Sequence, residues 1–306
     1  MDANNTVVTE FILLGFSKLG ESQFFLFPLF LLMYVVTVGG NMCIIITYNL
    51  NPNLHSPMYF FLGNFSFLEI LYVTSTVPNL LPNLLSDQKR ISFYGCATQM
   101  YCTLTFGGTE CYLLAAMAYD RYNAICRPLL YPVIMNRETC IKHIVGSWSI
   151  GAVNALIHTT LTFSLPFCKS NQINHFFCDV PPLLQLSCRN TWINECTIFG
   201  VVSCVVIASF ILTMFSYLQI ISTILQMHSS SGRRKTFSTC FSHLIVVTIF
   251  YGSGIFMYFR PKSSYGMDQE QVVSLMYTVI APLLNPFIYT LRNREVKLGI
   301  KKILHL

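Results

Sequence analysis

The sequence predicts an all-α membrane protein, a bundle of seven transmembrane helices followed by a short amphipathic helix at the C-terminal end. Of the 306 residues, 53% are hydrophobic and only 10% are charged, whereas a soluble domain carries about 25% charged residues. Several stretches reach the length of about 20 apolar residues that a helix needs to cross a bilayer. Helices are favoured over a β-barrel because the two-residue alternation of barrel strands is absent from the sequence.

Positive charge is distributed unevenly between the two predicted faces of the membrane. The expected cytoplasmic segments hold 12 Lys/Arg and three Asp/Glu, a net charge of +9, whereas the outer segments hold seven Lys/Arg and eight Asp/Glu, a net charge of −1. Because positive residues stay on the cytoplasmic side, this asymmetry predicts an outer N-terminus. The two faces together carry +8, and Glu69 and Glu110 inside the helices bring the formal net charge to +6. Because the positive charge lies on the inner membrane face, no nucleic-acid partner is expected.

The predicted chain has three parts. Residues 1–23 form an extracellular N-terminal tail, residues 24–291 form the seven-helix domain, and residues 292–306 form a cytoplasmic amphipathic helix and tail. No signal peptide is visible, so the first helix is expected to act as its own insertion signal. Asn4 begins an Asn-Asn-Thr glycosylation sequence on the predicted outer side, which suits a glycoprotein on the secretory route.

The first three helices are predicted from their apolar runs and end residues. The first spans about residues 24–48, and its Gly40-Asn41 pair suits close packing with an interhelical hydrogen bond. The second spans about residues 57–81 and begins with a proline, which suits the first turn of a helix. The third spans about residues 93–126. Thr103 and Arg121 lie 18 residues apart on it, or about 27 Å, so this helix connects an outer cavity to the inner membrane edge.

The remaining helices follow a long outer loop over about residues 166–195. The fourth helix precedes this loop and carries Trp148, and the fifth spans about residues 193–227. A very short turn at residues 229–232 leads to the sixth helix, which opens near Lys235. The seventh spans about residues 271–291 and contains prolines that kink a membrane helix. The basic segment after it is expected to lie on the inner leaflet, attracted by anionic membrane lipid.

A charged cluster ends the third helix, and its sequence resembles a known family. Asp120 and Arg121 follow a run from Gln99 to Ala118 in which Glu110 is the only charged residue. The segment MAYDRYNAIC resembles the MAYDRYVAIC signature of odorant receptors, a family of rhodopsin-like G-protein-coupled receptors, and departs from it at Asn123. Further resemblances lie at PMYFFL (57–62), NHFFCD (174–179), KTFSTCFSH (235–243) and FYG (250–252). Together they cover about residues 10–297, in the style of the tetrapod-type class.

Four cysteines lie on the predicted outer face, where the environment is oxidising, and their even number suggests two disulfides. They are Cys96, Cys168, Cys178 and Cys188. Four cysteines allow three pairings, and spacing alone does not choose between them. The resemblance implies Cys96–Cys178, which leaves Cys168–Cys188. A zinc site at His175 is disfavoured because the neighbouring cysteines are expected in disulfides.

The resemblance implies a conformational mechanism rather than catalysis. The sequence contains no phosphate-binding loop, nucleophile elbow or zinc-protease motif, so neither an enzyme nor a cofactor is expected. In the inactive state Arg121 would be held by Asp120 and by polar groups of the sixth helix, and on activation it would turn toward a G protein. The predicted switch residues are Asp120, Arg121, Tyr122, Tyr217, His243 and Tyr289. Alternatively, Asp120 and Arg121 merely anchor the helix at the membrane interface.

Two acids, Glu69 and Glu110, fall inside apolar helices. A carboxylate there must be paired, protonated or bound to a cation. Similarity to receptors that hold sodium nearby suggests a sodium or proton site shared by Glu69, Glu110 and Asn285. Two protonated acids in hydrogen-bond networks are the alternative.

The resemblance also places a ligand pocket among the outer halves of the helices. Its expected lining is Thr103, Leu104, Gly107, Gly108, Val201, Val202, Tyr251, Ile255, Tyr258 and Thr278. These residues are apolar with a few hydroxyl groups, which suits a small volatile odorant of low charge. Thr103 or Tyr258 would orient one polar group of the ligand. Thr103 stands where amine-binding relatives carry Asp, which argues against a cationic amine.

The leading interpretation is an odorant receptor of the plasma membrane that activates the stimulatory G protein of olfactory neurons and raises cAMP. A related receptor for a non-odorant metabolite in another tissue is the alternative. A transporter or channel is disfavoured because no internal repeat is visible and the charged motif lies at the membrane edge. A retinal-binding opsin is disfavoured because residues 271–291 contain no lysine.

Overall fold

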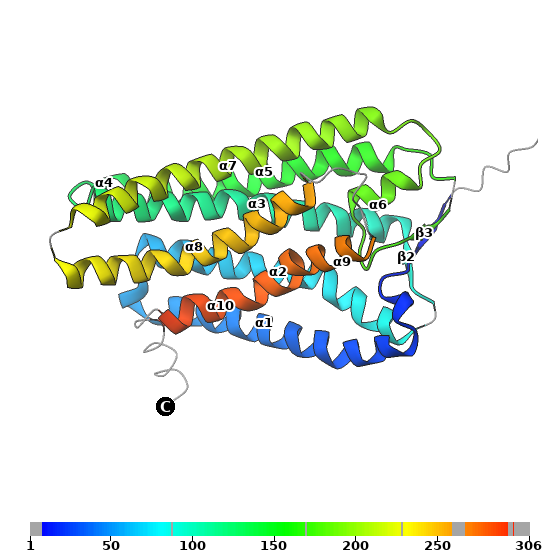
Figure 1. Cartoon of the computed structure of the whole chain (residues 1–306), viewed down its shortest axis with the longest axis horizontal. Coiled ribbons are helices and arrows are strands. Elements are labelled where there is room, and N and C mark those ends of the chain that lie inside the picture. Colours follow the sequence, from blue (N-terminus) through cyan, green and yellow to red (C-terminus); the bar gives the residue numbers. More distant parts are fainter. Residues whose placement is uncertain are drawn as a thin grey trace, which may run out of the picture.

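The computed structural model describes residues 8–86, 88–168, 170–227, 229–258, 267–292 and 296. It is mostly helical. The long helices are α1 (Leu26–Leu50), α2 (Pro57–Leu85), α3 (Phe93–Cys126), α5 (Arg137–Phe163), α7 (Trp192–Gln226) and α8 (Ser230–Tyr258). The last rod is continuous through α9 (Met267–Leu275), the π-helical turn η4 (Met276–Ile280) and α10 (Ala281–Arg292). Figure 1 shows these helices side by side as one elongated bundle.

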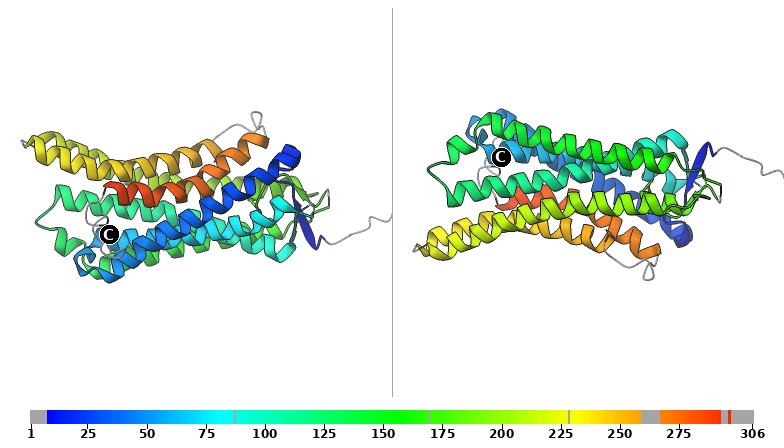
Figure 2. Two further views of the ribbon diagram at one scale, coloured as in Figure 1. Left: turned by 90° about the horizontal axis from the view of Figure 1, so that it is seen from below. Right: turned by 90° about the horizontal axis from the view of Figure 1, so that it is seen from above.

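Short elements gather at the two ends of this bundle (Figures 1 and 2). At one end lie β1 (Glu10–Leu13), β2 (Arg90–Ser92), β3 (Gln172–Ile173) and α6 (Val180–Gln185). The strands form a sheet in the order β2-β1-β3, with β1 antiparallel to β2 and parallel to β3. At the opposite end lie α4 (Tyr131–Ile134) and the connection between α7 and α8. These two ends correspond to the predicted outer and inner faces.

Part of the predicted N-terminal tail is folded onto the outer end. Phe11 and Leu13 of β1 are buried, and η1 (Ser17–Phe25) leads into α1. Phe11 packs against aromatic rings of the α3 start and of the following loops, with 5.4 Å between its ring centroid and that of Phe167. The alternating burial along β1 explains why a segment outside the apolar helices takes a fixed place.

The helix bounds follow the sequence prediction closely, with one clear difference at α8. Residues 230–232, predicted as a turn, form the first helical turn instead. The hydroxyl of Ser229 accepts a hydrogen bond from the Gly232 amide at 3.2 Å, and the Ser229 carbonyl accepts one from the Arg233 amide at 2.9 Å. A serine at this position caps a helix start, so the connection between α7 and α8 is shorter than predicted.

Within the described part of the chain, five helical stretches are long and apolar enough to cross a membrane. They are Ser17–Leu50, Pro57–Leu85, Arg137–Phe163, Trp192–Gln226 and Gln271–Tyr289. α3 is not among them because polar residues interrupt its apolar sequence. It is the central helix, in contact with α2, α5 and α7. Its buried polar residues, among them Thr109, Glu110 and Asn123, are therefore covered by protein rather than by lipid.

The outward face of α7 shows the opposite pattern. Phe199, Ile211, Phe215, Leu218 and Leu225 are all exposed on it. Such a continuous apolar face is unusual on a soluble monomer and is typical of a surface covered by lipid.

Candidate functional site

A cavity of about 90 Å³ lies in the outer half of the bundle. It is lined by Tyr72, Thr103, Leu104, Gly107, Gly108, Cys111, Asn154, Phe177, Asp179, Val202, Val205, Val206, Phe250, Tyr251, Gly254 and Tyr277. These residues come from α2, α3, α5, α7, α8, η4 and the loop before α6. The lining is largely apolar, with a few polar groups, which suits a small organic molecule.

The cavity gathers several of the residues predicted to bind ligand. Thr103, Leu104, Gly107, Gly108, Val202 and Tyr251 line it. Val201, Ile255 and Thr278 are not among its lining residues. Ile255 is 41% exposed, and the buried Thr278 hydroxyl donates to the Ser274 carbonyl at 2.7 Å. The side chain of Tyr258 lies outside the described residues.

Six polar or aromatic residues of the lining were missed by the sequence reasoning. They are Tyr72, Asn154, Phe177, Asp179, Phe250 and Tyr277. Asn154 carried a usable signal, because a polar side chain within an apolar membrane helix marks a candidate functional residue. Phe177 and Asp179 flank Cys178, so the disulfide predicted for that cysteine pointed to their position.

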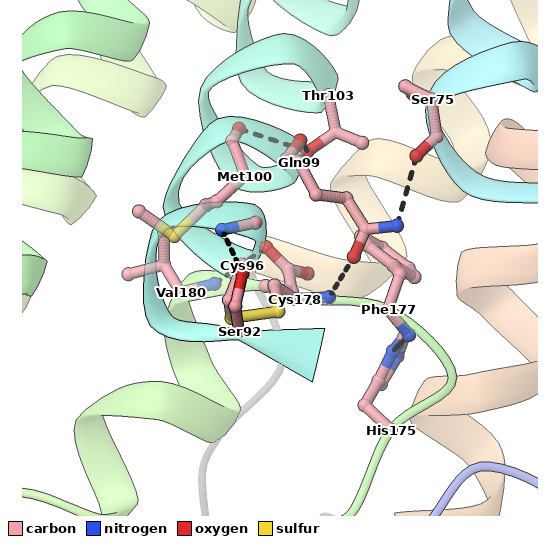
Figure 3. Close-up of a disulfide and its surroundings, with 12 residues drawn as sticks. Ser75, Ser92, Cys96, Gln99, Met100, Thr103, His175, Phe177, Cys178 and Val180 are labelled. Atoms are coloured by element: carbon pink, nitrogen blue, oxygen red, sulfur yellow. Dashed lines mark hydrogen bonds between the residues drawn. A yellow bond between two sulfur atoms is a disulfide. The ribbon is translucent and has the colours of Figure 1, made fainter. Parts of the chain in front are cut away.

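A disulfide and one glutamine hold the outer loop over the cavity (Figure 3). Cys178 is bonded to Cys96 in the first turn of α3. The side chain of Gln99, one turn further along α3, accepts a hydrogen bond from the Cys178 amide at 3.0 Å and donates one to the Ser75 carbonyl at 2.9 Å. The loop is thereby joined to α2 and α3 at the point where Phe177 enters the cavity lining. Cys168 pairs with Cys188, which gives both disulfides that the resemblance implied.

His175 fastens the same loop to α9. Its Nε2 lies 3.2 Å from the Ser274 hydroxyl, and its ring lies 4.7 Å from the Phe176 ring and 4.6 Å from the Phe177 ring between centroids. Burial lowers the pKa of this imidazole to about 3, so His175 is neutral at physiological pH. Cys178 is used in a disulfide, and the described residues contain no group of three His, Cys, Asp or Glu that could hold a metal ion.

At the inner end, Asp120 binds two partners. Its carboxylate accepts a hydrogen bond from Arg121 Nε at 3.0 Å and one from the Tyr131 hydroxyl of α4 at 2.8 Å. Asp120 is 1% exposed, and the Arg121 side chain 16%. Burial, reinforced by the Asp120 charge, raises the pKa of Tyr131, so its phenol stays a donor to that carboxylate.

The other predicted switch residues surround this pair. The Tyr217 hydroxyl of α7 lies 2.6 Å from Nδ1 of His243 on α8, and both side chains are buried. The Tyr122 ring lies beneath the guanidinium of Arg127, with 5.3 Å to the ring centroid. The buried Tyr289 hydroxyl has no hydrogen-bond partner in the described part of the chain. Arg121 donates no hydrogen bond to the described residues of α8, because His243 pairs with Tyr217 instead.

The two membrane acids lie in one buried polar centre between α2, α3 and α10. Asn285 donates a hydrogen bond to Oε1 of Glu69, and both Glu69 and Glu110 are 0% exposed. Oε2 of Glu69 and both carboxyl oxygens of Glu110 are buried without a hydrogen-bond partner among the residues described. Such oxygens require a proton or a bound cation, because an isolated carboxylate is strongly disfavoured away from water.

Two predicted features cannot be compared with this geometry. The glycosylation residue Asn4 lies outside the described residues, and so does most of the predicted amphipathic segment 292–306.

Comparison with known proteins gives one family. Residues 30–306 match the family described as "Olfactory receptor". The chain is similar to Olfactory receptor 5AP2 of Mus musculus, with 52% identity over 99% of this chain and 95% of that one. It is also similar to Olfactory receptor 9G4 of Homo sapiens (50% identity, 98% and 91% covered) and to Olfactory receptor 5I1 of Homo sapiens (49% identity, 99% and 96% covered).

Proposed function

Because this chain belongs to the olfactory receptor family, we propose that it transmits odorant binding in the outer cavity to a heterotrimeric G protein at the inner end of the bundle. The chain is an odorant receptor, a multi-pass membrane protein rather than an enzyme. The proposal concerns its site, its topology and its coupling to the stimulatory G protein that raises cAMP.

The proposed topology has seven membrane spans, formed by α1, α2, α3, α5, α7, α8 and the α9–α10 rod. The N-terminus is extracellular and carries a glycan at Asn4, and the C-terminal segment 292–306 lies along the inner leaflet of the plasma membrane. The charge asymmetry of the sequence supports this orientation. The position of the disulfide-bonded loop at the end opposite to Arg121 supports it as well.

The coupling rests on α3, which reaches both sites. Thr103 and Gly107 line the cavity, and Asp120 and Arg121 lie in the last two turns of the same helix. An odorant can shift the receptor toward one helix arrangement only by binding that arrangement more tightly. A ligand held between α3, α7 and α8 contacts the helices whose inner ends carry Arg121, Tyr217 and His243. This shared framework is the observation that carries the proposal.

The experiment is a cAMP assay over a broad panel of odorants in cells supplied with the olfactory stimulatory G protein. A dose-dependent rise in cAMP for a small set of odorants is expected, and it should disappear when that G protein is left out. A rise in cAMP that needs no G protein, or an ion flux in its place, would contradict the proposal.

A further inference from the structure

Among the described residues of the cavity lining, the carboxamide of Asn154 has no hydrogen-bond partner. Asn154 of α5 lines the cavity and is 7% exposed, and its Oδ1 is buried without a hydrogen bond from the described residues. A buried amide that forms no hydrogen bond costs about 1–3 kcal/mol. Because neither amide atom is held by a bond to the protein, the group can present its oxygen or its nitrogen.

A glycine contact between two helices brings this amide to the cavity. Gly151 of α5 lies against α3 so closely that a methyl group on it would come within 2.5 Å of the Thr105 carbonyl oxygen. A methyl group on Gly108 would lie 3.1 Å from Gly151 Cα and 3.7 Å from Nδ2 of Asn154. Small residues therefore allow α5 to approach α3, and Asn154, about one turn beyond Gly151, meets the space that Gly108 leaves open.

Other polar groups of the lining already have partners. The Thr103 hydroxyl lies 3.0 Å from the Met100 carbonyl oxygen of its own helix, and the Tyr251 hydroxyl donates to the Cys111 carbonyl at 3.0 Å. The Tyr277 hydroxyl donates to Ser274 at 3.2 Å, and Asp179 accepts the Val180 amide at 2.8 Å. The hydroxyl protons of Thr103, Tyr251 and Tyr277 are already donated within the protein, so a ligand oxygen has to compete for them. The Nδ2 protons of Asn154 are donated to no group among the described residues, so a ligand oxygen can accept them without competition.

We propose that Asn154 is the specificity-determining residue of the cavity, and that it selects neutral odorants carrying one hydrogen-bonding oxygen, such as alcohols and aldehydes. The inference rests on the odorant-binding role proposed for this cavity. The described lining contains no Lys, Arg or His to pair with an ionised acid, and it includes the carboxyl group of Asp179. The apolar remainder of the lining holds the hydrocarbon part, and the amide distinguishes the oxygenated compound from its parent hydrocarbon.

The test compares Asn154→Leu with the matched variant His158→Leu. Leucine has nearly the shape of asparagine without its polar atoms. His158 lies one turn further along the same buried face of α5 and also has unpartnered ring nitrogens among the described residues, but it does not line the cavity. Each set of probes shares one carbon skeleton and consists of the hydrocarbon, the alcohol and the aldehyde, such as octane, 1-octanol and octanal. Sets with linear and with cyclic skeletons are tested, and cAMP is the readout.

Asn154→Leu should raise the half-maximal concentration of the alcohol and aldehyde about tenfold, equivalent to about 1.4 kcal/mol, and leave that of the hydrocarbon unchanged or lower. His158→Leu should retain the wild-type preference for oxygen. Equal losses for all three probes, or a loss of the preference in Tyr72→Phe but not in Asn154→Leu, would overturn the proposal.

A second measurement does not depend on signalling. Thermal unfolding of the purified, odorant-free receptor should give the Asn154→Leu variant a Tm equal to or above that of wild type, because an unpaired amide is removed. A clearly lower Tm would assign Asn154 a structural partner and overturn the inference. If the Asn154→Leu variant is not expressed, Asn154→Ala replaces it in the cAMP assay and in the thermal unfolding measurement. A wild type whose Tm rises with 1-octanol but not with octane, and that gives no cAMP response to either, would reject the coupling and support the role of Asn154.

Discussion

The Tyr217 hydroxyl lies 2.6 Å from Nδ1 of His243, which joins α7 to α8 beside the buried Asp120–Arg121 pair. The two rings are stacked with 5.7 Å between their centroids. In this arrangement Arg121 is bonded to Asp120 and is therefore not available for the G protein contact that we propose. The Tyr217–His243 bond therefore holds the two helices in what we interpret as the inactive arrangement.

Replacing Tyr217 with Phe should lower the stability of this arrangement and raise basal cAMP. The change leaves both ring nitrogens of His243 without a partner among the described residues, since Nε2 already has none. A lost buried hydrogen bond costs about 1–3 kcal/mol. Basal cAMP and the Tm of the purified receptor measure the two effects. Tyr94→Phe is the matched control, because Tyr94 is 81% exposed. A lowered Tm with unchanged basal cAMP would limit the bond to a role in folding.

Arg121→Ala should reach the cell surface and abolish the cAMP response to odorant. The side chain is the cation that the proposed switch presents to the G protein, and its removal leaves Asp120 bonded to Tyr131. Surface labelling and cAMP are measured on the same cells. Arg137→Ala is the control because Arg137 is exposed at the start of α5 and is not among the predicted switch residues. Intact signalling by Arg121→Ala would reduce the Asp120–Arg121 pair to an interfacial anchor.

The helix α3 shows most clearly how much of the fold can be predicted from the sequence. Its bounds were predicted correctly from its apolar run and from the charged motif that marks its end. In the structure Ser92 caps its start by accepting a hydrogen bond from the Gly95 amide at 3.1 Å. Its hydropathy alone is a poor guide, since a central helix covered by other helices can carry polar residues. Motifs and caps are formed by residues close together in the chain, so they can be recognised from a single sequence.

The cavity shows what such local signals leave out. Val201 and Val202 were both predicted to line the cavity, but only Val202 lines it. Neighbouring residues of a helix point about 100° apart, so the two side chains do not face the same space. Asn154 reaches the cavity through a glycine contact between two helices, and Phe177 through a disulfide and the side chain of Gln99. These contacts join residues far apart in the sequence, so the sequence alone did not predict that Asn154 and Phe177 line the cavity.

Glu110→Gln should abolish any dependence of odorant potency on sodium concentration. Both carboxyl oxygens of Glu110 are buried without a hydrogen bond from the described residues, and Glu69 keeps one oxygen in the same condition. This geometry favours a cation or proton site over two acids satisfied by hydrogen-bond networks. Potency is measured at matched ionic strength with sodium replaced by choline. Equal sodium dependence in wild type and Glu110→Gln would reject the ion site, and a wild type indifferent to sodium would favour protonated acids.

Acidification should loosen the outer loop through His175. The imidazole of the docked loop has a pKa of about 3, whereas its ordinary value is 6.5. Because His175 takes up a proton more readily when the loop is detached, acidic pH favours the detached loop. The stabilisation by loop docking is fully present above about pH 6.5 and is lost as the pH falls toward 3, by at most about 1.4 kcal/mol per pH unit. The protection factors of the amides of residues 172–178, that is, the intrinsic hydrogen-exchange rate at each pH divided by the measured rate, should fall over this interval in the purified receptor.

The variant His175→Gln tests whether that pH dependence belongs to the imidazole. Glutamine can keep a hydrogen bond to Ser274 but does not titrate. The protection factors of residues 172–178 in this variant should therefore depend much less on pH than those of wild type. His55→Gln is the control, because His55 is exposed and lies outside the loop, between α1 and α2; it should keep the wild-type dependence. If His175→Gln exchanges with the wild-type pH profile, another group governs the docking of the loop over the cavity.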